Sequence, residues 1–289
     1  MHRKSLIVTT ILVSAVIGSA APTLAGVQLV TNGDFETNGG NGQLDSTTTA
    51  TGWFMDPSMS PGYTFLFNPQ ANTISGTSAD NAGATGEYGS LSLWGPGNGS
   101  ANGLTLSPTG GAFVALDSAF QQDALDQTIN GLTAGEEYTV TFNWAAAQQL
   151  TFNTSTFDTL TVSLGSQSFT TSQVNLPEHG FSGWMSQSFT FTATGPSEVL
   201  SFFASGGPPG APPFAMLDSV SMMAVPEPST WAMMLAGFGG LGYAGFPLEP
   251  PQGRRDRLTA CAQPNTVGPP SGGLVALRPS ALAAWRATS

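Results

Sequence analysis

Short segments in which apolar and polar residues alternate occupy the middle of the chain. The clearest runs from Tyr138 to Trp144, where aromatic or aliphatic residues alternate with threonine and asparagine. Successive side chains of a β-strand point to opposite faces, so this period of two predicts a half-buried strand. Related patterns predict strands at residues 27–30, 63–67, 112–116, 160–164, 188–192, 199–203 and 214–220.

Turn signals separate these predicted strands. Asn32-Gly33 and Gly195-Pro196 are typical of turns, and residues 98–111 and 206–213 are rich in glycine and proline. No segment between residues 27 and 224 has a convincing amphipathic helical pattern. Many short strands at this spacing favour a β-sandwich or barrel, and the even composition favours one domain over residues 26–224.

Charge is distributed unevenly along the chain. The net charge is −11, and neither lysine nor arginine occurs from Ser5 through Gly253. Nucleic acid is therefore excluded as a partner, because neutralising phosphates supplies most of that affinity. An anionic surface attracts cations and repels acidic polymers. The single cysteine, Cys261, excludes a disulfide within one chain.

The N-terminus has the layout of a secretory signal peptide. A short cationic region, Met1 to Lys4, precedes an apolar stretch at residues 6–21. Small residues before Gly26 place the expected cleavage after Ala25, which makes residues 1–25 the signal peptide. An uncleaved membrane helix is the alternative. The body is expected to fold outside the cytoplasm.

An uncharged apolar run follows the predicted body. Residues 225–246 read VPEPSTWAMMLAGFGGLGYAGF. As a helix, the sixteen residues from Trp231 to Phe246 would measure about 24 Å, somewhat less than a bilayer core of about 30 Å. A helix packed in a soluble core would show a polar face, which this run lacks. Its glycines weaken a helix in water but are tolerated in lipid.

The start of this run resembles the PEP-CTERM sorting signal in its Pro-Glu-Pro-x-x-Trp-Ala variant. The matching residues are Pro226, Glu227, Pro228, Trp231 and Ala232. The resemblance implies processing by an exosortase, a membrane transpeptidase-like enzyme, in a Gram-negative bacterium that makes exopolysaccharide. It also implies a transient anchor in the inner membrane and a final location in the cell envelope or extracellular matrix.

The tail departs from that family. An arginine-rich end should follow the apolar run directly, but residues 247–251 read PLEPP and the arginines begin only at Arg254. Residues 247–289 are expected to be disordered. The abrupt change in composition suggests a shifted reading frame, which the other two frames of the gene would reveal by an arginine-rich stop.

The body shows a second resemblance, to galactose-binding-like jelly rolls, the fold of many carbohydrate-binding modules. Three stretches carry it: LVTNGDFE at residues 29–36 with Gly52-Trp53, DQTINGL at residues 126–132, and PFAMLDSV at residues 213–220. The resemblance implies an all-β jelly-roll β-sandwich. It also implies that residues 126–138 form a central hairpin and that residues 213–220 form the last strand.

The same resemblance implies a structural Ca²⁺ between the first and last strands. The matching positions are Glu36 and Asp218, with backbone carbonyls as further ligands. Carboxylates without a lysine or arginine to pair with need a cation or hydrogen bonds when they are buried. The alternative stays open that Asp34 and Asp218 only accept hydrogen bonds from turn amides.

Exposed aromatic residues are the candidates for sugar binding. Trp53, Trp144 and Trp184 lie in or beside predicted strands and are expected in the core. The candidates in turn-rich segments are Tyr63, Tyr88 and Trp94.

Catalytic signatures are weak. The body has one histidine, His179, in a loop, and no spacing pairs two of its glutamates. We therefore expect a non-enzymatic, envelope-sorted surface protein that binds extracellular polysaccharide. A structural matrix protein without a specific ligand and a glycoside hydrolase are the alternatives.

Overall fold

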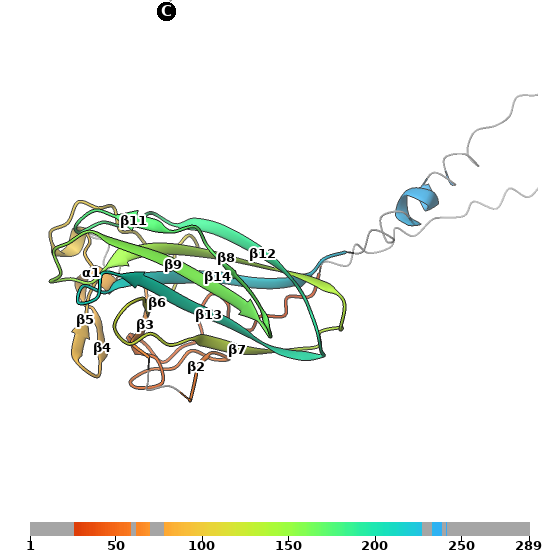
Figure 1. Ribbon diagram of the computed structural model, residues 1–289, viewed down its shortest axis with the longest axis horizontal. Coiled ribbons are helices and arrows are strands. Elements are labelled where there is room, and N and C mark those ends of the chain that lie inside the picture. The colour runs from red at the N-terminus through yellow and green to blue at the C-terminus, as the bar shows by residue number, and fades with distance from the viewer. Residues whose placement is uncertain (1–25, 59–61, 70–77, 227–232, 239–240, 242–289) are drawn as a thin grey trace, which may run out of the picture. The chain divides into compact units, whose positions relative to one another are not determined.

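A computed structural model describes residues 26–58, 62–69, 78–226, 233–238 and 241 (Figure 1). The chain divides into two compact units between Ala232 and Met233. The first unit contains the β-rich body. The predicted signal peptide, residues 1–25, and the predicted tail, residues 247–289, lie outside the described residues.

The body is a sandwich of two antiparallel sheets, which form the two layers seen in Figure 1. The first sheet has the strand order β1-β3-β6-β14-β8-β12. Its strands are β1 (Gly42–Gln43), β3 (Thr64–Phe67), β6 (Phe113–Asp117), β14 (Pro213–Ala224), β8 (Glu137–Gln148) and β12 (Met185–Thr192).

The second sheet has the order β10-β9-β13-β7-β2, and β11 also pairs with β9. Its strands are β10 (Gln167–Thr170), β9 (Thr156–Leu164), β13 (Ser197–Gly207), β7 (Leu125–Asn130), β2 (Phe54–Met55) and β11 (Val174–Leu176). Every one of these pairings is antiparallel. The fold is thus the all-β jelly-roll sandwich that the sequence predicts.

The main core fills the space between the two sheets. Alternate residues of β8, such as Phe142 and Trp144, meet Phe202 of β13 and Trp53 there. The outward residues of β9, β13 and the first half of β8 are polar or only partly buried, so these segments keep the period-two pattern. In the second half of β8, the outward residues Ala145 and Ala147 are buried in a second core. Trp53 and Trp144 are core residues, as expected from the sequence.

A second core lies on the other face of the first sheet. It joins Phe65, Phe113 and Phe214 to residues of a covering segment at positions 79–104. That segment contains α1 (Ser78–Asn81), the hairpin of β4 (Ala84–Gly86) and β5 (Gly89–Leu91), and the 3₁₀ helix η1 (Pro96–Asn98). Because both faces are covered here, β3 and β6 are buried at every position despite their alternating sequence pattern.

Two sequence-based expectations about the topology are wrong. Residues 126–138 do not form a hairpin, because β7 and β8 lie in different sheets and residues 131–136 cross between them. Residues 27–30 form no regular strand, although they run beside β14. The Leu29 N–H donates to the Met222 carbonyl at 3.0 Å, and the Val220 N–H donates to the Gly33 carbonyl at 2.8 Å.

The body's two chain ends lie together, at the end opposite α1, β4 and β5 (Figure 1). Gly26 is beside Met223, and a shallow, mostly apolar depression there is lined by both residues and by Val225 and Pro226. The Val225 N–H still donates to the Glu137 carbonyl at 2.8 Å. The folded sheet therefore continues up to the residue before Pro226.

Candidate functional site

An aromatic depression lies at the end of the body where the covering segment sits. Its volume is about 400 Å³. Five separate parts of the chain line it: the start of β3, the β4–β5 hairpin, the β6–β7 loop, the segment after β8 and the β13–β14 loop. The lining residues are Tyr63, Tyr88, Ser90, Ala119, Phe120, Gln149, Phe152, Gly210 and Pro212. We call this site the aromatic pocket.

Three rings of the pocket contact one another. The centroid of Tyr63 lies 5.9 Å from those of Tyr88 and Phe120, and the last two lie 5.8 Å apart. Tyr88 and Phe120 are each 59% exposed, whereas Tyr63 is 5% exposed. Tyr63 is therefore the floor of the pocket, and the other two rings are walls with faces open to solvent.

Tyr63 is supported from below by the second core. Its ring packs edge-on against Phe65 at 4.5 Å and tilts over Phe214 at 6.2 Å. Burial, with the nearby Asp117 carboxyl and the Tyr88 phenol, raises the pKa of Tyr63. The phenol of Tyr63 therefore stays protonated at neutral pH.

Hydrogen bonds fix the two walls. The Asp117 Oδ1 atom accepts the backbone N–H groups of Ala119 and Phe120, both at 2.7 Å, which sets the turn that carries Phe120. The Gln121 side-chain amide donates to the Tyr88 hydroxyl at 3.0 Å. The Tyr63 N–H donates to the Gln121 carbonyl at 2.9 Å, so the β6–β7 loop, which carries Phe120, is hydrogen-bonded to both Tyr63 and Tyr88.

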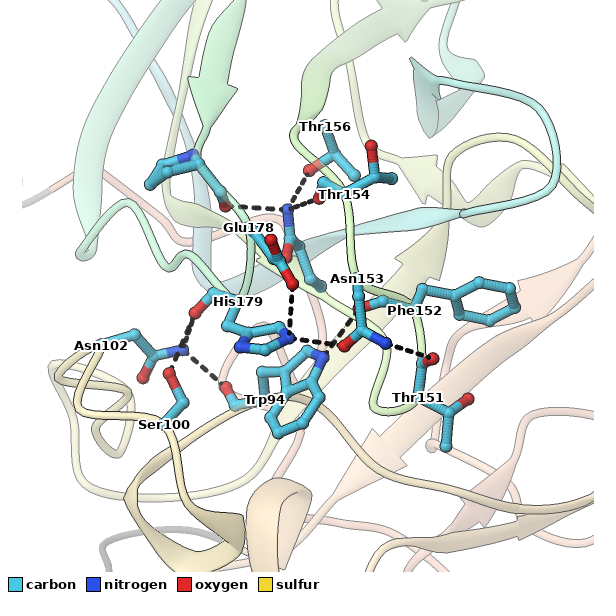
Figure 2. A network of polar contacts seen from close by, with 12 residues as sticks. Trp94, Ser100, Asn102, Thr151, Phe152, Asn153, Thr154, Thr156, Glu178 and His179 are labelled. Carbon is cyan, nitrogen blue, oxygen red and sulfur yellow. Dashed lines mark hydrogen bonds and ion pairs between the residues drawn. The ribbon is translucent and has the colours of Figure 1, made fainter.

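Trp94 lies beside the pocket and does not line it. Its indole N–H donates to the Phe152 carbonyl at 2.9 Å, and Phe152 is a lining residue. The ring of Trp94 lies against the His179 imidazole, with centroids 3.8 Å apart and planes at 31° (Figure 2). His179 therefore covers part of the indole ring. Trp94 contributes to the pocket through its hydrogen bond to Phe152, which positions that lining residue.

A polar network around His179 holds three loops together (Figure 2). The Asn102 side-chain amide donates to the carbonyls of Trp94 and His179, at 2.8 and 2.9 Å. His179 Nε2 contacts the Asn153 side-chain oxygen at 2.6 Å and Glu178 Oε1 at 3.4 Å. The backbone of His179 has φ 58°, a conformation uncommon outside glycine. His179 thus has a structural part in joining these loops.

Glu36 and Asp218 both bind the loop that precedes β6. Glu36 Oε1 accepts the Ala112 N–H at 2.6 Å, and Asp218 Oδ2 accepts the Thr109 hydroxyl at 2.7 Å. Asp218 is buried, and its Oδ1 atom has no hydrogen-bond partner. An orphaned buried carboxylate oxygen fits the need for a cation. No group of three or more His, Cys, Asp or Glu side chains comes together among the described residues, so a cation at Glu36 and Asp218 would need backbone carbonyls as further ligands.

Burial of uncompensated carboxyl groups is a general feature of the body. No lysine or arginine occurs from residue 5 to residue 253. The carboxyl of Asp158 is enclosed and accepts the Ser118 hydroxyl at 2.6 Å. Burial is the largest cause that raises the pKa of five aspartates: Asp117, Asp123, Asp126, Asp158 and Asp218.

Sequence reasoning selected Tyr63, Tyr88 and Trp94. The structure brings Tyr63 and Tyr88 together in the pocket and places Trp94 beside it, and the other lining residues were missed. Phe120 is the most exposed of those missed aromatic residues, in the sequence Ser118-Ala119-Phe120-Gln121 directly after a predicted strand. A bulky aromatic residue in a polar turn is the signal that could have found it. Phe152 and Gln149 have no such signal, because only the tertiary fold brings them to the pocket.

The predicted sorting segment is described only in part. Pro226 is the last described residue of the first unit, and Glu227, Pro228, Trp231 and Ala232 lie outside the described residues. In the second unit, residues 233–238 are helical and exposed. Within the described ranges, no helix has the length and apolar character needed to cross a membrane.

Comparison with known sequences defines the class of protein. The PEP-CTERM protein-sorting motif matches residues 224–246, so this is an exported protein that an exosortase sorts to the cell envelope or surface. The family "Protein of unknown function (DUF642)" matches residues 76–222, slightly more than half of the chain. The chain belongs to this DUF642 family. No curated protein matches the chain.

Several solved structures align with most of the body at low identity. A CBM4 structure has 18% identity and a TM-score of 0.32, and covers 68% of this chain and 99% of its own. TmCBM61 in complex with β-1,4-galactotriose has 14% identity, a TM-score of 0.34 and coverage of 69% and 100%. The K3 adhesin domain of Lys-gingipain from Porphyromonas gingivalis has 12% identity, a TM-score of 0.35 and coverage of 68% and 98%.

Proposed function

We propose that this exported protein binds a neutral polysaccharide in the aromatic pocket, without catalysis. The observation that carries the proposal is the pair of open rings, Tyr88 and Phe120, around the buried ring of Tyr63. Exposed large rings are costly in water, and hydrogen bonds hold both of these rings in place. A fixed cluster of open rings indicates a binding surface.

The chemistry of the pocket suits a sugar ring. The C–H groups on one face of a pyranose pack on aromatic rings, while its hydroxyls need polar partners. The Tyr88 hydroxyl, Ser90 and Gln149 supply such partners beside the rings. The volume of about 400 Å³ is in the range of small-molecule sites and accommodates one or two sugar rings.

Electrostatics favour an uncharged sugar. The lining residues include no cation, and residues 5–253 contain no lysine or arginine. The net charge of −11 would repel a polymer of uronic acids or sulfated sugars. The proposed ligand is therefore an extracellular polysaccharide with neutral residues at the bound positions.

A hydrolase is the weaker candidate. Glycoside hydrolysis uses two carboxyl groups on either side of the scissile bond. None of the residues that line the pocket carries a carboxyl group or an imidazole. Asp117, directly behind the Phe120 turn, is buried and already accepts two backbone N–H groups.

Affinity electrophoresis of the full-length protein tests the binding proposal. The gels would contain soluble β-glucan, galactan, xylan, polygalacturonate or the host's own extracellular polysaccharide. We expect at least one neutral polymer to retard the protein, and polygalacturonate to have no effect. Phe120→Ala and Tyr88→Ala should each weaken binding by about tenfold or more, which corresponds to about 1.4 kcal/mol.

Phe157→Ala is the matched control for these variants. Phe157 is also an exposed phenylalanine, at 40%, but it lies on β9 and does not line the pocket. Its removal should leave the affinity unchanged. Retardation that persists in Phe120→Ala and Tyr88→Ala, or the absence of retardation by every neutral polymer, would reject the pocket as a glycan site and favour the matrix role.

We also propose a structural Ca²⁺ held by Glu36 and Asp218, supported by the orphaned Asp218 Oδ1 atom. Calcium should raise the melting temperature and a chelator should lower it. At a free concentration a hundred times the dissociation constant, the ion would add about 2.7 kcal/mol to the free energy of unfolding. Asp218→Asn should abolish the response in a differential scanning experiment, and an unchanged melting temperature with chelator would remove both residues from the metal site.

The proposed host is a Gram-negative bacterium that makes exopolysaccharide. Before processing, the apolar run that follows Pro226 would hold the chain in the inner membrane. The position of the sorting motif directly after the body supports this order of events, because the body must be exported before the motif is reached.

A further inference from the structure

β12 is an open edge of the first sheet. It is the last strand in the sheet order and pairs only with β8. Its eight residues make it longer than the other edge strands, since β1 and β2 have two residues each and β10 has four. Short edge strands offer little to a pairing partner, so β12 is the one edge of useful length among the described strands.

The hydrogen bonds around β12 show which backbone groups face outward. The Ala193 N–H donates to the Glu136 carbonyl at 2.9 Å, so Ala193 faces β8. Alternate residues of a strand direct their N–H and C=O groups to the same side. The backbone N–H and C=O groups of Phe191, Phe189 and every second residue before them therefore point toward β8. The backbone groups of the alternate residues point away from β8; these residues are Ser186, Ser188, Thr190 and Thr192.

The outward backbone groups of Thr192 are already hydrogen-bonded to the side chain of Gln167. The Gln167 side-chain amide donates to the Thr192 carbonyl and accepts the Thr192 N–H, the second bond measuring 3.2 Å. These are the two bonds that a neighbouring strand would exchange with Thr192. Gln167 thus closes the end of the edge and shows that its geometry accepts a peptide-like group.

The rest of the edge is unprotected. Among the described residues, the one side-chain contact on the outward groups of Ser186, Ser188 and Thr190 is a bond of 3.4 Å from Gln187 to the Ser188 carbonyl. Proteins commonly protect edge strands with lysine, proline or bulges. The sequence from Gly180 to Ser197 contains no charged residue, and β12 contains no proline. The β8–β12 register has no bulge.

We propose that β12 pairs with β12 of a second copy of this chain, antiparallel and about a two-fold axis at Ser188. Ser188 then lies opposite Ser188, and Ser186 lies opposite Thr190 of the other copy. All three are outward-facing residues, so each pair exchanges two backbone bonds. The exposed serine and threonine side chains are small enough to meet without a clash.

A second copy fits the edge because the outward residues Ser186, Ser188 and Thr190 are self-complementary about Ser188, and the lack of charge at the edge permits the contact. Two copies with a net charge of −11 repel each other over most of their surfaces. The uncharged stretch around β12 lets them meet without placing carboxylates opposite one another. Pairing would join the two first sheets into one continuous sheet, and it leaves the aromatic pocket of each copy open, because β12 supplies none of its lining residues.

Cysteine cross-linking of the full-length protein in mild detergent tests the pairing. The background is Cys261→Ser, which removes the native thiol. Ser188→Cys should give a disulfide-linked dimer in most of the protein under mild oxidation, because opposed residues of a hydrogen-bonded pair lie within disulfide range. Val199→Cys is the control, since it is 39% exposed on β13, which has a neighbour on each side.

A second variant tests the backbone bonds themselves. Ser188→Pro removes an outward N–H and leaves the bonds to β8 intact, so the fold should survive. Sedimentation equilibrium should show dimers of the parent protein and at least a tenfold weaker association of Ser188→Pro. Equal cross-linking at positions 188 and 199, no cross-link at 188, or a cross-link at 188 only to a different host protein would each overturn the proposal.

Discussion

Replacement of Phe214 by alanine is expected to lower the free energy of unfolding by about 3–5 kcal/mol and to disrupt the aromatic pocket. Phe214 is fully buried in the second core, where its ring lies 6.2 Å from Tyr63 and 6.4 Å from Phe65. The substitution leaves a cavity under the floor of the pocket. Urea denaturation would give the stability, and affinity electrophoresis would give the sugar affinity at a temperature where the variant is folded.

Phe202→Ala provides the matched control. Phe202 is equally buried, but it packs in the main core against Trp53 and Phe142. A similar loss of stability is expected, with sugar affinity unchanged. If both variants lost affinity equally, or if Phe214→Ala kept full affinity, the pocket would not depend on the second core as described.

Mild acid is expected to stabilise the body, which is the second large effect. Burial raises the pKa of several aspartates, and that of Asp123 rises from 3.8 to about 6. The folded chain therefore binds more protons than the unfolded chain in this range, and its stability rises as the pH falls. The stabilisation that protonated Asp123 contributes to the free energy of unfolding is fully present below pH 3.8 and is lost as the pH rises through about 6. Asp56 has a lowered pKa and opposes the trend, but it is exposed and the effect is small.

Urea denaturation between pH 4.5 and 8 would measure this dependence. Asp123→Asn removes one titrating group and keeps an oxygen that can accept the Ala124 N–H, bonded to Asp123 at 2.7 Å in the parent. The variant should be at least as stable as the parent at pH 8 and should gain less on acidification. A parent protein that loses stability from pH 8 to pH 5 would show that the buried carboxyls are compensated in another way.

Local pattern was sufficient to predict the class of fold. The alternation in β8, β9 and β13 reflects burial on one face, and that signal is present in the sequence itself. The last strand, β14, was also correctly placed by its resemblance to jelly-roll domains. Strand pairing was harder, because β7 and β8 read as a hairpin while their separation into two sheets depends on long-range packing.

Burial of the second face of the first sheet was beyond the reach of local pattern. Phe65 and Phe113 are covered by residues 79–104, a segment rich in glycine and serine with little periodicity. The same segment supplies Tyr88 to the pocket. The sequence identified Tyr63 and Tyr88 as aromatic residues in turns, but the part played by Phe120, and the contact of Trp94 with His179, depend on the loops that this segment brings together.

One strand connects the proposed sugar-binding pocket to the sorting motif. Pro212, immediately before β14, lines the pocket, and Pro226, two residues after β14, opens the sorting motif. Twelve extended residues span about 40 Å. A body attached through its C-terminal side would thus hold the proposed sugar site about 40 Å from its point of attachment. The folded sandwich itself would set this distance.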